Sequence, residues 1–262
     1  EGRSSAYTII ETTLKNQPFL IDSIQLYLRR NNIKEISCIH PLFTIERDKK
    51  NRIIKIDPGT QPGIRESFIH IEVERIAEPE RLSKIENDLR EILLEAQYVV
   101  QDFPRIIKEI KDIINELEYS SQFLPQRKIE VKETIDFLRW LLDENMVLLG
   151  YGSYSYYSDE GEQFIQLNPG SELGICRAGE LHLPLAKSLA DLPEDIKDIF
   201  TTPNILMVDK SPFETVVHRS GKVDQIGIKK LNEKNQVVEY KLILGLFTLR
   251  AISQEGTKIP IL

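Results

Sequence analysis

The sequence is poor in the residues that build cross-linked or metal-bound folds. Its 262 residues contain two cysteines, Cys38 and Cys176, which lie far apart and outside any CxxC pair. This spacing supports neither a disulfide framework nor a zinc site, and a reducing cytoplasm is the expected location. The four histidines form no HxH or HxxxH arrangement, so the sequence predicts no metal site.

Long apolar runs and an excess of positive charge are also missing. No run approaches the roughly 20 apolar residues that cross a bilayer, so no membrane partner is predicted. Lys and Arg total 34 against 41 Asp and Glu, a net charge of −7, which argues against binding nucleic acid through phosphate contacts. The chain does not begin with Met, and residues 1–5 lack the apolar core of a signal sequence, so we expect a piece of a longer protein.

The common motifs of nucleotide binding and hydrolysis are absent as well. Residues 150–152 (Gly-Tyr-Gly) begin like a dinucleotide fingerprint, but Ser155 replaces the third glycine, and strand-forming residues follow where a helix is required. Residues 221–222 (Gly-Lys) lack the earlier glycine of a P-loop, and no GxSxG elbow occurs. The sequence therefore predicts no catalytic residue.

The residues that are present predict a globular α+β protein. Hydrophobic residues make up 41% and charged residues 29% of a chain long enough to form a sizeable core. Residues 5–103 alternate in the order β-α-β-β-β-α, close to the split βαβ order of ferredoxin-like domains. The expected strands are 7–14, 36–45, 53–56 and 67–74, and the expected helices are 19–30 and 80–99.

The rest of the chain divides into a helical part and a β-rich part. Residues 104–145 carry apolar stripes at helical spacing, which predict a helical connector made of two helices. Such a stripe either mediates dimerisation or signal transmission, or packs on the flanking domains. Residues 146–252 predict an antiparallel sheet with helices on one side. Its expected elements include a short helix within 193–200 and a strand at 215–219.

Several separated segments carry a resemblance to a known family. They are residues 18–23 (PFLIDS), 37–41 ending in His-Pro, 66–72 (ESFIHIE), 137–145 (FLRWLLDEN) with LGY at 149–151, 173–177, 217–219, 226–229 and 244–248. In this order they resemble the N-terminal part of the large bacterial NAD-dependent glutamate dehydrogenases. Gln17, Ser171 and residues 249–252 depart from the family pattern, which puts a role for those loops in doubt but not the resemblance.

The resemblance implies an ACT-like domain (5–103), a helical connector (104–145) and a β-rich PAS-like domain (146–252). It also implies a parent enzyme that oxidises L-glutamate to 2-oxoglutarate and ammonia with NAD. The nicotinamide-binding domain and catalytic residues of that family lie further along the chain. We therefore expect no cofactor in this region, a role in regulation and assembly, and as partners the catalytic region of the same chain and further copies of it.

The resemblance also points to one candidate site. ACT domains commonly bind amino acids at the loop between the first strand and the first helix, which here contains Asn16, Gln17 and Phe19. Amide groups and the free N–H groups at a helix start suit a carboxylate, and Asp22 suits an ammonium; His40 is a second-rank candidate. In the alternative, Asn16 and Asp22 only cap and solubilise the helix. A stand-alone amino-acid sensor and a purely structural assembly arm also remain open.

Overall fold

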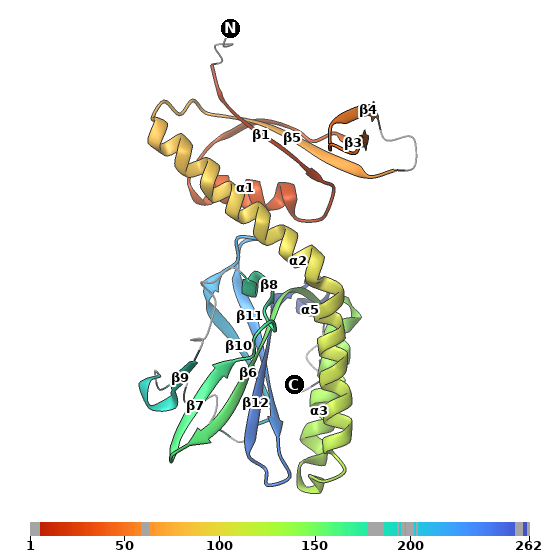
Figure 1. Ribbon diagram of the computed structural model, residues 1–262, viewed down its shortest axis with the longest axis vertical. Coiled ribbons are helices and arrows are strands. Elements are labelled where there is room, and N and C mark those ends of the chain that lie inside the picture. Colours follow the sequence, from red (N-terminus) through yellow and green to blue (C-terminus); the bar gives the residue numbers. More distant parts are fainter. Residues whose placement is uncertain are drawn as a thin grey trace. The chain divides into compact units, whose positions relative to one another are not determined.

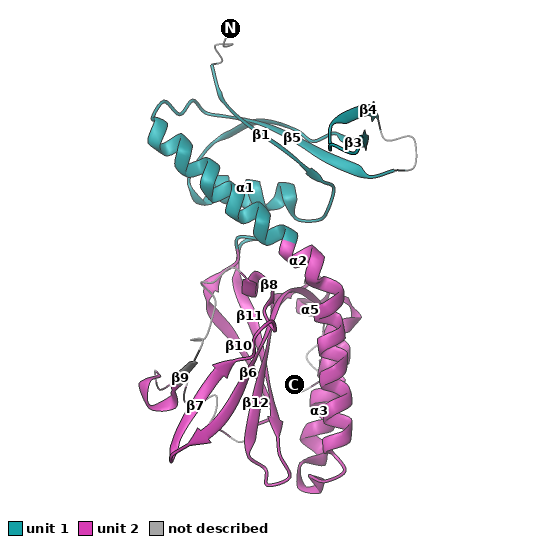
Figure 2. Ribbon diagram, in the orientation of Figure 1, with its two compact units in different colours: residues 1–97, 216–220 teal, residues 98–215, 221–262 magenta. Residues whose placement is uncertain are grey.

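The computed structural model describes residues 6–58, 63–177, 186–192, 194, 197, 202, 204–254 and 259–260. It divides into two compact units: unit 1 comprises residues 1–97 and 216–220, and unit 2 comprises residues 98–215 and 221–262 (Figure 2). Both units combine helices with antiparallel strands, which confirms the predicted α+β class. The domain ranges 5–103, 104–145 and 146–252 stay predictions, since a division by compactness does not test them.

Unit 1 is one antiparallel sheet with helices on one face (Figure 1). Its central strand, β5, pairs with β1 along one edge and with both β2 and β3 along the other, while β4 extends the sheet from β3. The bounds are β1 Thr8–Lys15, α1 Leu20–Arg30, β2 Glu35–Ile39, β3 Leu42–Arg47, β4 Ile53–Asp57, β5 Arg65–Val73 and α2 Pro79–Ser120.

The period-two pattern of β5 explains how this sheet acquires its core. Ile69, Ile71 and Val73 are buried, and the residues between them are half-buried, as the alternation predicts. Against this face pack the apolar stripe of α1, which includes Leu20, Ile24 and Leu28, and the first turns of α2. The strand expected at 36–45 is wrong in one respect: it is two strands, and His40 lies between them, because Pro41 has no N–H for a ladder.

The helix α2 corrects a second expectation. The sequence predicted separate helices before and after residue 103, but α2 runs without a break from Pro79 to Ser120 and contains Pro104. Proline removes one backbone hydrogen bond from a helix, so a break is the usual result. Pro104 is exposed and Val100, whose carbonyl loses its donor, is half-buried, so water can satisfy that carbonyl and the helix continues.

Unit 2 is built on a seven-stranded antiparallel sheet in the order β10-β11-β12-β6-β7-β9, with the short β8 paired to β6. The strand bounds are β6 Met146–Asp159, β7 Glu162–Leu167, β8 Leu173–Gly174, β9 Ala186–Ser188, β10 Leu206–Glu214, β11 Lys222–Leu231 and β12 Val237–Phe247. The remaining helical segments are η1 Pro125–Arg127, α3 Lys128–Trp140, the π-turn η2 Leu141–Asn145, η3 Ile175–Arg177, η4 Leu189–Asp191 and α5 Leu249–Ile252.

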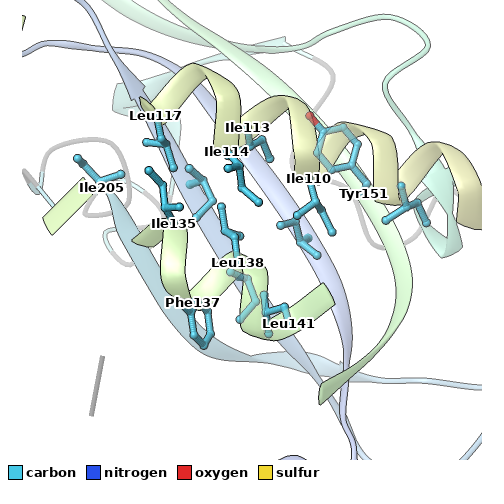
Figure 3. Packing of buried hydrophobic residues seen from close by; sticks show 14 of the residues in the cluster. Ile110, Ile113, Ile114, Leu117, Ile135, Phe137, Leu138, Leu141, Tyr151 and Ile205 are labelled. Atoms are coloured by element: carbon cyan, nitrogen blue, oxygen red, sulfur yellow. The ribbon is translucent and has the colours of Figure 1, made fainter. Parts of the chain in front are cut away.

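The apolar stripes of residues 104–145 form the core of unit 2 together with the inner face of the sheet. Ile110 and Leu138 are fully buried, and Figure 3 shows the side chains of α2 and α3 gathered over the strands. In this unit, the apolar stripes therefore pack against the sheet. The burial of apolar surface, which contributes about 25 cal/mol per Å², is the main stabilising contribution to the packing of these helices on the sheet.

Residues 215–219 do not form the strand expected from their β-branched composition. Residues 216–220 form bends instead, His218 has a positive φ of 75°, and the segment belongs to unit 1. Val216 packs against the core of unit 1, and Val217 is buried, so tertiary packing overrides local propensity here. The helix expected within 193–200 falls outside the described residues, apart from residues 194 and 197.

Candidate functional site

The loop between β1 and α1 has an unusual backbone. After β1, the Asn16 N–H still donates to the Arg65 carbonyl at 2.9 Å. Phe19, directly before α1, adopts a left-handed conformation with φ 74° and provides no side-chain cap. The first N–H groups of a helix have no partner within it. The helix start therefore offers uncapped backbone donors beside the loop.

Gln17 adds a polar side chain to this loop. Its Nε2 atom is buried and has no hydrogen-bond partner in the described part of the chain. A buried amide donor without a partner costs roughly 1–3 kcal/mol. Such a group is therefore a point where a bound molecule would gain a hydrogen bond that the protein itself does not make.

His218 joins the loop from residues 216–220, within the same compact unit. Its ring lies 5.2 Å from that of Phe19, centroid to centroid, and its backbone N–H donates to the buried Ser23 hydroxyl at 3.3 Å. Its Nδ1 atom lies 4.0 Å from a carboxylate oxygen of Asp22, and no hydrogen bond to that buried Nδ1 occurs among the described residues. From the sequence, His218 is only part of the family-like segment 217–219.

The ionisation of His218 follows from this setting. Burial lowers the pKa of the imidazole below its usual value; the Asp22 carboxylate opposes this shift, and the Arg219 guanidinium adds to it. At neutral pH the ring is therefore mainly uncharged, with one nitrogen donating and the other accepting. The Asp22 side chain is 53% exposed, so its carboxylate is accessible to a ligand that approaches the loop.

His40 lies apart from this group. Its Nε2 is 2.6 Å from the hydroxyl of Ser67, a buried residue of β5. Among the described residues, no hydrogen bond, ion pair or ring contact joins His40 to Asn16, Gln17, Phe19 or Asp22. The structure thus brings Phe19 and Asp22 together with His218, and it leaves the second-rank candidate His40 elsewhere on the sheet.

The chemistry of the loop suits a small zwitterion. Asp22 provides negative charge, the helix start provides N–H donors, and Gln17 and His218 provide neutral polar groups beside an aromatic face. A carboxylate at the helix start and an ammonium at Asp22 would both be matched by opposite charge or dipole. The described residues contain no group of His, Cys, Asp and Glu that could hold a metal ion.

Unit 2 holds a second unusual titratable group that sequence reasoning missed. Lys229 is almost fully buried, and its Nζ donates to the carbonyl and hydroxyl oxygens of Thr202 at 2.6 and 2.8 Å. Burial, reinforced by the Arg127 guanidinium and opposed by Glu130, lowers the pKa of Lys229 to about 8. The sequence does not distinguish Lys229 from the adjacent Lys230, although only Lys229 points inward.

The buried charge of Lys229 gives stability a testable pH dependence. Between pH 8 and about 10.5 the unfolded chain keeps this proton and the folded chain has lost it. The free energy of unfolding should therefore rise with pH, relative to a Lys229→Met variant, by about 1.4 kcal/mol per pH unit in this window. Urea titrations followed by fluorescence of the single tryptophan, Trp140 in unit 2, measure this. A pH-independent difference between the two proteins would contradict it.

The order of the sheet in unit 1 and the helices on one face define it as an ACT-type fold. Residues 1–89 match the family model described as the ACT1 domain of glutamate dehydrogenase. Among the described residues, no helix is long and apolar enough to span a membrane.

Relatives of known name extend this match along the chain. An NAD-specific glutamate dehydrogenase of Halomonas elongata is 29% identical over 264 positions, which cover 100% of this chain and 16% of that protein. The NAD-specific glutamate dehydrogenase of Pseudomonas aeruginosa is 25% identical over 99% of this chain and 16% of its own. That of Mycobacterium tuberculosis is 26% identical over 54% of this chain. The chain thus resembles the N-terminal region of NAD-specific glutamate dehydrogenases, and it spans about a sixth of the length of the first two.

Proposed function

We propose that unit 1 binds a free amino acid at the β1–α1 loop and that the chain regulates and assembles an NAD-dependent glutamate dehydrogenase without contributing catalytic groups. The observation that carries the proposal is the group formed by Phe19, Asp22 and His218 at the uncapped start of α1. The buried Gln17 amide nitrogen, which has no hydrogen-bond partner among the described residues, supports it. The names of the relatives support the choice of parent enzyme.

In this proposal the amino acid lies with its carboxylate at the first turn of α1 and its ammonium at Asp22. Gln17 supplies a hydrogen bond, and His218 closes the loop as a neutral ring. The parent reaction, L-glutamate with NAD and water giving 2-oxoglutarate, ammonia and NADH, takes place outside this region. The catalytic region of the same chain and further copies of the chain are the partners, and the cytoplasm is the location.

Binding to the purified chain tests the proposal. We expect one amino acid from a panel, which also contains 2-oxoglutarate and NAD, to raise the melting temperature by a few degrees and to give a calorimetric isotherm. A hundredfold excess over Kd stabilises a native state by about 2.7 kcal/mol. Asp22→Asn should weaken binding about thirtyfold, because a charge-assisted hydrogen bond to the ammonium is lost, and His218→Ala about tenfold.

A matched histidine variant controls for general effects. His70→Ala removes a ring from β5 that pairs with Glu11 at 2.9 Å, outside the loop, so binding should stay unchanged. Equal loss in His70→Ala and His218→Ala would contradict a site at the loop. Absence of binding by the whole panel would favour the assembly arm, and glutamate-dependent reduction of NAD by this chain would contradict the non-catalytic role.

A further inference from the structure

The described part of unit 1 has one strand fewer than the pattern that it otherwise follows. The ferredoxin-like order β-α-β-β-α-β ends with a strand after the second helix, and that strand lies beside the first. In the described part of unit 1, no strand follows α2, because the helix continues to Ser120. β1 therefore pairs with β5 alone among the described strands, and its other edge is unpaired.

A groove of about 610 Å³ marks the vacant position. It is lined by β1 and by the first five turns of α2, and it is flanked by the exposed apolar side chains of Ile9, Leu82 and Leu94. The Thr12 hydroxyl in the same groove is buried, with no hydrogen-bond partner in the described part of the chain. Apolar side chains and an unpaired hydroxyl are what a neighbouring strand would cover.

Apart from the charged Glu11 and Lys15, the strand lacks the features that protect free edges. β1 is eight residues long, contains no proline, and pairs with β5 in an unbroken register without a bulge. Natural proteins shorten, twist or cover such edges, because every second residue presents an N–H and a C=O outward. An edge of this kind is expected to be occupied.

We propose that the occupant is β1 of a second copy, antiparallel, with the two-fold axis at Thr12. This register places Ile10 opposite Leu14 of the second copy on the helix side of the sheet. Thr12 meets Thr12, so each buried hydroxyl gains a partner. On the other face Glu11 lies opposite Thr13 of the second copy and diagonally next to its Lys15 and its Glu11, so two contacts of opposite charge outweigh one contact of like charge.

Charge and the number of paired residues together favour this register: an axis at Thr13 would set Glu11 opposite Lys15 but would pair only residues 11–15. An axis at Glu11 would set two like carboxylates directly opposite each other, which destabilises a strand pair. An axis at Thr12 pairs residues 9–15 of both copies, almost the whole of β1. The contact is isologous, so the dimer closes and neither copy of β1 keeps an unpaired edge.

Cysteine cross-linking of the 262-residue chain tests both the dimer and its register. In Thr12→Cys, two thiols face each other about 5 Å apart, and oxidation should give a covalent dimer in most molecules. Ile9→Cys is the matched control: the same strand carries an exposed thiol, but its mate lies roughly 20 Å away. It should cross-link no more than the unsubstituted chain, which controls for Cys38 and Cys176.

Sedimentation without any cross-link gives an independent result. The unsubstituted chain should be a dimer, and Ile9→Lys, an exposed position, should weaken it about tenfold, because each new lysine faces Lys15 of the other copy. A monomer at all concentrations overturns the proposal, as does a dimer insensitive to Ile9→Lys. Cross-linking of Ile9→Cys as efficient as that of Thr12→Cys would overturn the register. None of these readouts depends on an amino-acid ligand.

Discussion

Replacing Gly174 with alanine is expected to lower the free energy of unfolding of unit 2 by about 4 kcal/mol, an exceptionally large effect for one methyl group. Gly174 has φ 60°, a conformation that disfavours a side chain. A Cβ at this position would overlap the carbonyl oxygen of Leu149, which is fixed in β6. The Gly174 N–H also donates to Asp102 Oδ2 at 2.9 Å. Relief of the overlap would displace that hydrogen bond.

Gly170 provides the matched control for this prediction. Its φ of 76° is similarly positive, but a Cβ there has no neighbour within 4 Å. Gly170→Ala should therefore show conformational strain alone, about 1 kcal/mol. Urea unfolding monitored by Trp140 fluorescence compares the two variants in the same unit. Similar losses in both would show that the close approach of Leu149 and Gly174 is unimportant.

The surroundings of Gly174 show what a resemblance can and cannot predict. Residues 173–177 were noted only as a family-like segment. In the structure the Arg177 guanidinium lies 4.1 Å from the ring centroid of Tyr98 and 3.3 Å from Asp102 on α2. The segment thus fastens β8 and η3 to the helix. The sequence pattern shows that segment 173–177 is distinctive. Its partners, Tyr98 and Asp102, lie more than 70 residues earlier in the chain, and no local pattern links them to it.

Local periodicity predicted the elements better than it predicted their partners. The alternation of β5 and the stripes of α2 and α3 depend on neighbours within one element, so the sequence revealed them. Pro104 did not end α2, and residues 216–220 joined unit 1 instead of forming a strand. The first outcome depends on access of water to the helix, and the second on packing against the core of unit 1. Phe19 and Asp22 are close in sequence and could be identified as site candidates, whereas His218 reaches them only through the fold of unit 1.

The family-like segment 137–145 forms the connection between α3 and β6. It ends α3 and turns through η2 into β6, and Glu144 takes a positive φ of 57° in that turn. Asp143 pairs with Arg250 at 2.8 Å. Asn145, at the end of this turn, contacts both α3 and the turn itself.

Asn145→Ala is expected to lower the free energy of unfolding of unit 2 by about 3 kcal/mol. Asn145 is fully buried, and its Nδ2 donates to the carbonyl oxygens of Trp140 and Asp143 at 2.8 and 3.0 Å. Its Oδ1 accepts a hydrogen bond from Gln254 Nε2 at 2.9 Å. Alanine would remove three hydrogen bonds and leave a small void at a fully buried position, and each lost hydrogen bond costs roughly 1 kcal/mol.

The nearly isosteric variant Asn145→Asp separates hydrogen bonding from packing. It keeps the volume and the acceptor for Gln254, but at pH 7 it sets a carboxylate against the carbonyl oxygens of Trp140 and Asp143. Its loss should exceed that of Asn145→Ala and should shrink below about pH 4, where the protonated carboxyl can donate one hydrogen bond. Urea titrations at both pH values, followed at Trp140, measure this. A smaller loss for aspartate than for alanine at pH 7 would mean that volume, rather than the donated hydrogen bonds, holds the turn between α3 and β6.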